Sequence, residues 1–109
     1  MIPSAKKYTL KFIKKEKIRD EIYSFYFTTS GDQLINWIPG QYLQLSLPHS
    51  VDERGSSRFF SIASSPTEKE IMLTIKKGKS SFKKALFRLD AGTLVNAFGP
   101  MGKFILDVD

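Results

Sequence analysis

The sequence contains no cysteine and a single histidine, His49. The absence of cysteine excludes disulfides, thiolate nucleophiles, zinc sites with thiolate ligands and iron–sulfur clusters held by cysteine. A metal site needs several converging ligands, and one histidine that follows a proline in a polar stretch is typical of an ordinary loop residue. The sequence therefore predicts no metal site, and it disfavours hydrolysis by a catalytic triad.

Long hydrophobic runs are missing as well. Nowhere do about eighteen apolar residues follow one another, and the beginning of the chain lacks the apolar core of a secretory signal. We therefore expect a soluble, cytoplasmic protein without a membrane segment. The G-x-G-x-x-G motif of dinucleotide-binding α/β domains is also absent from this sequence.

The chain has 109 residues, enough for one domain, and a net charge of +6. Seven of the seventeen basic residues lie near the beginning: Lys6, Lys7, Lys11, Lys14, Lys15, Lys17 and Arg19. Such a skew is compatible with nucleic acid or with an acidic protein partner. However, the first lysines are interleaved with Tyr8, Leu10 and Phe12, as in a strand with one solvent-facing side. We favour a solvated strand face and keep the binding of a partner as the alternative.

Most of the sequence predicts β-structure. Short apolar segments rich in β-branched and aromatic residues alternate with turn signals, which is typical of an antiparallel sandwich or barrel. The clearest strand covers residues 41–47, because leucines at every second position alternate with polar residues. The other predicted strands are residues 8–13, 22–28, 58–63, 71–76, 93–98 and 104–108, the last two separated by a turn over residues 99–102. The fold class is therefore all-β.

One segment, residues 81–89, has helical periodicity. Its apolar residues recur at the spacing i, i+3, i+4, i+7 of a buried stripe: Phe82, Ala85, Leu86 and Leu89. Ser80 or Ser81 is a suitable N-cap, and Gly92 is a suitable stop signal beyond the end. The sequence thus predicts one short helix after the fifth strand.

The stretch RFFSIASSP at residues 58–66 is the most informative for function. An extended strand points successive side chains to opposite faces. One face would carry Arg58, Phe60 and Ile62, and the other Phe59, Ser61 and Ala63. Because both faces mix polar and apolar side chains, the stretch differs from a purely structural strand and indicates a ligand-binding one.

A flavin dinucleotide needs apolar walls for its ring system and cations or backbone N–H groups for its pyrophosphate. Arg58 can pair with phosphate oxygens, and the backbone amides of residues 78–81 precede the predicted helix, where anions bind. Phe60 can lie against the ring, and Ser61 can donate a hydrogen bond to its edge. Taken singly, each feature also has a structural explanation: a surface charge, a core aromatic or an ordinary helix cap.

Three motifs in order make the combination specific. Residues 39–42 match the P-G-Q-aromatic turn, and residues 58–64 match R-x-Y-S-x-x-S with phenylalanine in place of tyrosine. Residues 78–81 match the phosphate-binding G-x-x-S, followed by the G-P-x-G-x-F turn at residues 99–104. The chain therefore resembles the FAD-binding domain of the ferredoxin reductase-like flavoprotein oxidoreductases, the ferredoxin-NADP reductase family.

This resemblance implies a six-stranded antiparallel Greek-key barrel with one capping helix and with FAD across its outside. It also implies that Arg58 binds the pyrophosphate, that Phe60 packs on the flavin, and that Ser61 is the catalytic residue near the reactive ring nitrogen. The expected cofactor-binding residues are Arg58, Phe59, Phe60, Ser61, Ile75, Lys76, Gly78, Lys79, Ser80 and Ser81. Ile75 and Lys76 would act mainly through their backbone, and FMN is the less favoured alternative to FAD.

Members of this family continue into an α/β domain that binds NAD(P)H. Residues 1–109 are therefore expected to form the FAD-binding half of an NAD(P)H-dependent oxidoreductase, with the nicotinamide domain absent from this chain. NAD(P)H would be a substrate only together with that domain, and an acidic electron-transfer protein is a candidate acceptor. The alternative is a basic β-barrel that binds nucleic acid or a protein without catalysis.

Overall fold

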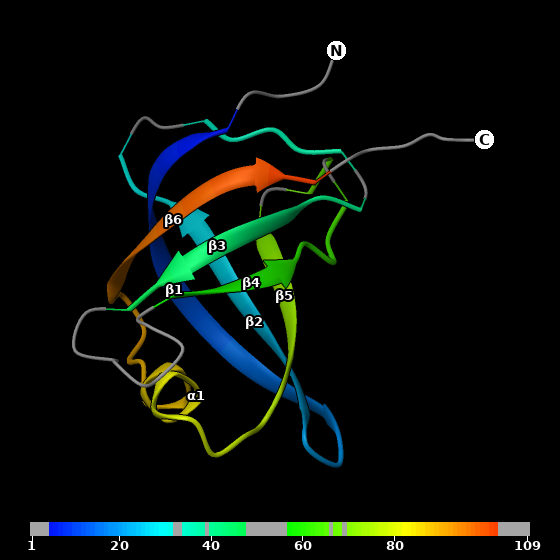
Figure 1. The fold of residues 1–109 in the computed structure, drawn as a ribbon, viewed down its shortest axis with the longest axis vertical. Helices are drawn as coiled ribbons and strands as arrows, with labels where there is room; N and C mark the ends of the chain where they lie inside the picture. Colours follow the sequence, from blue (N-terminus) through cyan, green and yellow to red (C-terminus); the bar gives the residue numbers. More distant parts are fainter. Residues whose placement is uncertain are drawn as a thin grey trace.

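The computed structural model describes residues 5–31, 34–38, 40–47, 57–65, 67–68 and 70–102. Within these residues the elements are β1 (Lys6–Arg19), β2 (Ile22–Thr29), β3 (Tyr42–Ser46), β4 (Ser57–Ser61), β5 (Ile71–Lys76), α1 (Ser81–Phe87) and β6 (Leu94–Met101). The six strands form one sheet in the order β4-β3-β6-β1-β2-β5, and all neighbouring strands are antiparallel (Figure 1).

The two edge strands of this sheet meet and close it into a barrel. An isolated antiparallel bridge joins Ile62, directly after β4, to Leu73 in β5. The backbone N–H of Ala63 donates to the carbonyl of Met72 at 2.7 Å beside it. Since β6 lies between β1 and β3, the strand order is that of a Greek key, and α1 covers one end of the barrel (Figure 1). The predicted six-stranded Greek-key barrel with one capping helix is confirmed.

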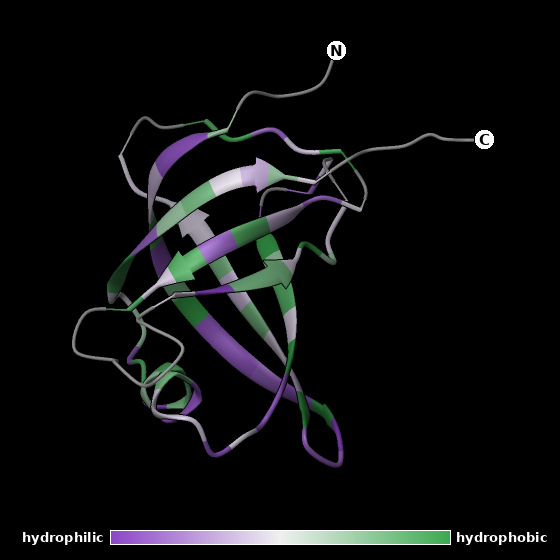
Figure 2. Ribbon diagram, in the orientation of Figure 1, coloured by the Kyte–Doolittle hydropathy of each residue, from purple (hydrophilic) through white to green (hydrophobic). Residues whose placement is uncertain are grey.

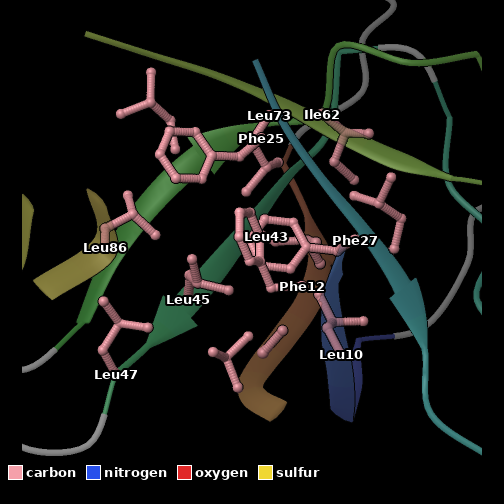
Figure 3. Packing of buried hydrophobic residues seen from close by; sticks show 14 of the residues in the cluster. Leu10, Phe12, Phe25, Phe27, Leu43, Leu45, Leu47, Ile62, Leu73 and Leu86 are labelled. Carbon is pink, nitrogen blue, oxygen red and sulfur yellow. The ribbon is translucent and has the colours of Figure 1, made fainter. Parts of the chain in front are cut away.

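Alternating side chains fill the barrel. The leucines of β3 at positions 43 and 45 are fully buried and Leu47 is nearly so, as their alternation predicted. Phe25 lies at the centre, with its ring centroid 5.8 Å from that of Phe12 and 4.9 Å from that of Phe87. Figure 3 shows Phe12, Phe25, Leu43 and Leu45 converging from their strands, with Leu86 reaching the same cluster from α1. The helix thus completes the core.

In the first half of β1, buried side chains alternate with more exposed ones. Tyr8 and Phe12 are 6% and 3% exposed and belong to the core, whereas Lys7 and Lys11, each next to one of them in the sequence, face solvent. Stacking on nucleic acid bases needs exposed aromatic rings, which these two residues do not provide. The early lysines therefore occupy the solvated face of a half-buried strand.

The sequence predicts that the first strand ends at Ile13. In the structure β1 continues to Arg19 and pairs with β2 in a long hairpin. All side chains from Lys14 to Arg19 are exposed, and Figure 2 shows this polar stretch toward the hairpin end. Glu16 accepts hydrogen bonds from Tyr26 (3.1 Å) and Lys14 (3.3 Å), which lower the pKa of its carboxyl. Backbone pairing with β2, rather than burial of side chains, extends this strand. The hydrophobic pattern of the sequence therefore does not predict the extension.

β6 also runs further than predicted, because residues 99–101 belong to the strand and not to a turn. Pro100 has no N–H to give to the ladder, and a bulge is where a strand accommodates such a residue. The register between β3 and β6 shifts at this place, between Tyr42 and Gln44. Gly99 has a φ of 147°, and a Cβ there would lie 2.8 Å from Leu43 Cδ2. The predicted strand 104–108 lies outside the described residues.

α1 ends at Phe87 rather than at Leu89. The N–H groups of Arg88 and Leu89 bond to carbonyls three residues back, at 3.1 and 3.3 Å, which tightens the last turn and ends the helix. Gly92 has a φ of 95° and its N–H bonds to the Phe12 carbonyl, so this glycine serves the turn into β6. In the described part of the chain no helix has the length and apolar character needed to span a bilayer.

Candidate functional site

The two faces of β4 differ in burial, and their membership is as predicted. Arg58 and Ile62 are 8% and 6% exposed, and Phe60 between them is half-buried. On the opposite face Phe59 is 59% exposed and Ser61 is also exposed. The inward face therefore contains a buried cation, which an ordinary barrel wall would not include.

The guanidinium of Arg58 is held in a defined orientation. Its Cζ lies 5.2 Å from the centroid of the Phe82 ring, and its Nη1 donates to the carbonyl of Ser57 at 2.8 Å. Phe82 is fully buried in α1, and its ring is 6.0 Å from that of Phe60. A guanidinium carries five N–H donors in one plane, so fixing that plane in advance suits it to the binding of a phosphate group.

Arg58 lies in the wall of a pocket between β4 and the beginning of α1. The volume of this pocket is about 390 Å³, and its lining residues are Ser57, Arg58, Phe59, Phe60, Ser80 and Lys83. The pocket brings together four of the predicted site residues, from two of the three motifs. Among the described residues of its lining, two side chains are cationic and none is acidic. This balance of charge favours an anionic ligand.

Ser80 both lines this pocket and caps α1. It is the N-cap of α1, with its Oγ accepting a hydrogen bond from the backbone N–H of Lys83 at 3.1 Å. A hydroxyl that accepts in this way keeps its own proton to donate. Lys79 is exposed and Ser81 is the first helical residue, and neither belongs to the lining of the pocket. Of the two serines predicted as caps, Ser80 is the N-cap in the structure.

Some backbone N–H and C=O groups of β5 are directed toward β4, into the seam between these two strands. The N–H of Lys77 donates to the carbonyl of Glu21 at 2.8 Å, so alternate residues of β5 bond to β2. By this alternation the backbone groups of Ile75 face β2, whereas those of Thr74 and Lys76 face the seam. The side chain of Ile75 is 2% exposed and belongs to the core. Of the two predicted β5 residues, only Lys76 directs its backbone to the seam.

Ser61, the predicted catalytic residue, lies on the outer face of β4. A shallow depression of about 280 Å³ is lined there by Tyr42, Phe59 and Ser61. The Tyr42 and Phe59 rings meet edge to face, with centroids 5.7 Å apart. The hydroxyl of Ser61 is therefore accessible at the end of β4, beside the bridge that closes the barrel.

A larger groove lies elsewhere, on the outer face of β1, β3 and β6. Its volume is about 740 Å³, and its lining combines the cationic Lys7 with hydroxyl, amide and aromatic groups, including those of Gln44, Asn96 and Phe98. It contains none of the predicted site residues. Among the described residues no group of three or more histidine or acidic side chains is arranged to hold a metal ion. The smaller pocket at Arg58 is therefore the better candidate site.

Two residues that the sequence did not single out lie at the Arg58 pocket and at the seam between β4 and β5, respectively. Lys83 lines the Arg58 pocket and donates from Nζ to the carbonyl of Lys76 at 2.6 Å. Thr74 directs its backbone toward the seam. Neither belongs to a motif, because the position of Lys83 depends on how the loop before α1 folds and that of Thr74 on the register of β5.

Comparison with known sequences gives a match over nearly the whole chain. The family model for the oxidoreductase FAD-binding domain matches residues 9–105. Flavohemoprotein A of Dictyostelium discoideum is 31% identical over 75 residues, which are 63% of this chain and 19% of that protein. The chain therefore spans about a fifth of the length of this relative.

Solved structures share the barrel. Phthalate dioxygenase reductase is 27% identical, with a TM-score of 0.72 over 91% of this chain and 31% of its own. The Amycolatopsis cytochrome P450 reductase is 23% identical, with a TM-score of 0.76 over 94% of this chain and 30% of its own. The resemblance predicted from the three motifs is confirmed. Because the family model covers residues 9–105, the chain belongs to the oxidoreductase FAD-binding domain family, whose cofactor is FAD.

Proposed function

We propose that this chain is the FAD-holding part of a larger NAD(P)H-dependent oxidoreductase that delivers electrons to an acceptor. The observation that carries this proposal is the pocket in which Arg58, Phe60 and Ser80 meet, where the described lining residues include two cations and no carboxylate. FAD supplies the hydride-accepting and electron-transferring chemistry that protein side chains lack. The barrel contributes binding, orientation and electrostatics.

Each side chain has a role in this proposal that its surroundings support. Arg58 binds the pyrophosphate, since its guanidinium is already oriented by Phe82, and Ser80 donates its O–H to the same group. Phe60 provides an apolar wall for the ring system. Ser61, with its accessible hydroxyl, donates to the reactive edge of the ring, and the seam-facing backbone of Lys76 bonds to another edge.

The nicotinamide and the acceptor require further protein. Phthalate dioxygenase reductase is described as a modular structure for electron transfer from pyridine nucleotides to a [2Fe-2S] centre, and this chain covers 31% of it. We propose an NAD(P)H-binding domain, in the same or another chain, as the partner of this barrel. We propose Lys15 and Lys17, which are exposed and share one face of the β1–β2 hairpin, as part of the contact surface for an acidic electron-transfer protein.

A titration of the purified chain with FAD and with riboflavin tests the proposed cofactor role. We expect saturable binding of one FAD, with changes in the visible spectrum and the fluorescence of the flavin. FAD should bind more tightly than riboflavin, because only FAD carries the pyrophosphate. Absence of binding at tens of micromolar FAD would contradict the proposal. Salt-sensitive binding of a single-stranded oligonucleotide, without flavin binding, would favour the alternative of a nucleic-acid-binding barrel.

A further inference from the structure

We propose that Lys83 is the second cation of the pyrophosphate site, a role that no motif of the sequence assigns to it. This inference rests on the proposed function and specifies which groups neutralise the cofactor. It follows from three features of Lys83: its place in the pocket wall, its hydrogen bonds at both ends, and the glycine that it crosses.

Lys83 ties three parts of the site together. Its backbone N–H donates to Ser80 Oγ at 3.1 Å, and its Nζ donates to the carbonyl of Lys76 at 2.6 Å. The side chain therefore spans the loop from the end of β5 to the beginning of α1. In doing so it passes closely over Gly78, where a Cβ would lie 2.7 Å from Lys83 Cδ. Glycine at this position leaves the room that the lysine stem occupies.

Among the described lining residues, Arg58 and Lys83 together balance the charge of a pyrophosphate. The pyrophosphate of FAD carries two negative charges at neutral pH, and Arg58 supplies one positive charge. Lys83 is the other charged residue among the described residues that line the Arg58 pocket. An ammonium has three N–H donors, which allow it to serve more than one oxygen at a time. Lys83 can therefore bond to a phosphate oxygen while it holds the Lys76 carbonyl.

The bond to Lys76 gives Lys83 a second effect. Lys76 directs its backbone to the seam where the flavin ring is proposed to lie, and Lys83 holds that carbonyl at 2.6 Å. The same side chain thus connects the phosphate end of the site with the ring end. A ligand that has the flavin ring but no phosphate would be affected by Lys83 only through the Lys76 carbonyl, at the ring end of the site.

Lys84 is a matched control for this residue. It lies next to Lys83 on α1, is exposed, and does not line the Arg58 pocket. Lys83→Met and Lys84→Met remove the same charge from the same helix, and methionine keeps an unbranched stem like the one that passes over Gly78. The two variants therefore differ in local contact with the pocket rather than in net charge.

Dissociation constants for FAD and riboflavin, measured at several salt concentrations, test the proposal. We expect Lys83→Met to weaken FAD about 10- to 100-fold, as for loss of a charge-assisted hydrogen bond, and riboflavin by less than about threefold. Lys84→Met should change either by less than about threefold. Lys83→Arg, which keeps the charge, should retain most of the FAD affinity. Equal FAD affinities of the Lys83→Met and Lys84→Met proteins would overturn the role of Lys83.

A second measurement does not depend on how the variants fold. Lysine acylation of the wild-type chain, read by mass spectrometry, should show Lys83 protected by FAD but not by riboflavin, with Lys84 unaffected by either ligand. Unchanged acylation of Lys83 at saturating FAD would overturn the proposal. Failure of the wild-type chain to bind FAD would instead overturn the proposed function, and this inference with it.

Discussion

Replacing Arg58 with methionine is expected to weaken FAD binding about 100-fold, because charge-assisted and bidentate hydrogen bonds to the pyrophosphate are lost. The affinity for riboflavin should change by less than about threefold, since riboflavin has no phosphate. Methionine keeps much of the aliphatic stem beside Phe82 while removing the guanidinium. Titrations followed by flavin fluorescence measure both ligands with the same protein.

Arg88 offers a control for the loss of one positive charge from the domain. It is exposed at the C-cap of α1 and is absent from the lining of the Arg58 pocket. Arg88→Met should leave FAD affinity within about twofold of the wild type, as for an exposed charge outside the pocket. Thermal melts without ligand show whether each variant is folded. Equal losses of FAD and riboflavin affinity in Arg58→Met would contradict the assignment of Arg58 to the pyrophosphate.

The second large effect is expected in the core. Phe25→Ala should lower the free energy of unfolding by about 3–5 kcal/mol, as for removal of a fully buried aromatic ring. Phe25 is 0% exposed, and its ring joins β2 to α1 through Phe87 at 4.9 Å. Such a loss is a large part of the total stability of about 5–15 kcal/mol that small domains have. Urea titration of the unliganded protein measures it.

Phe59→Ala removes the same atoms from an exposed position. The Phe59 side chain is 59% exposed on the outer face of β4. We expect this variant to lose less than about 1 kcal/mol, the range of surface substitutions that break no buried contact. If both phenylalanine variants lost similar stability, Phe25 would not be at the centre of the core.

The fold could be predicted where burial alternates along the chain. The leucines at positions 43 and 45 of β3, with Leu47 directly after it, predict both the strand and its inward face. The outer half of β1 has no such alternation, because its side chains are all exposed and only pairing with β2 makes it a strand. At Pro100 the sequence indicated a turn, but a bulge between β3 and β6 accommodates the proline within the strand.

The candidate site likewise contains residues that the sequence could predict and residues that it could not. Arg58, Phe60 and Ser80 belong to motifs of local sequence, and the structure brings them together in one pocket. Lys83 could not be found from such motifs, since its role depends on a side chain that crosses a loop to reach Lys76. The direction of each backbone group in β5 depends on its pairing with β2, which no residue type encodes.

A crystal structure of this chain with FAD tests the central claim most directly. We predict the pyrophosphate in the pocket formed by Arg58, Ser80 and Lys83, with the ring system along the seam between β4 and β5. Density for FAD in the larger groove on the outer face of β1, β3 and β6, beside Gln44 and Asn96, would contradict this account.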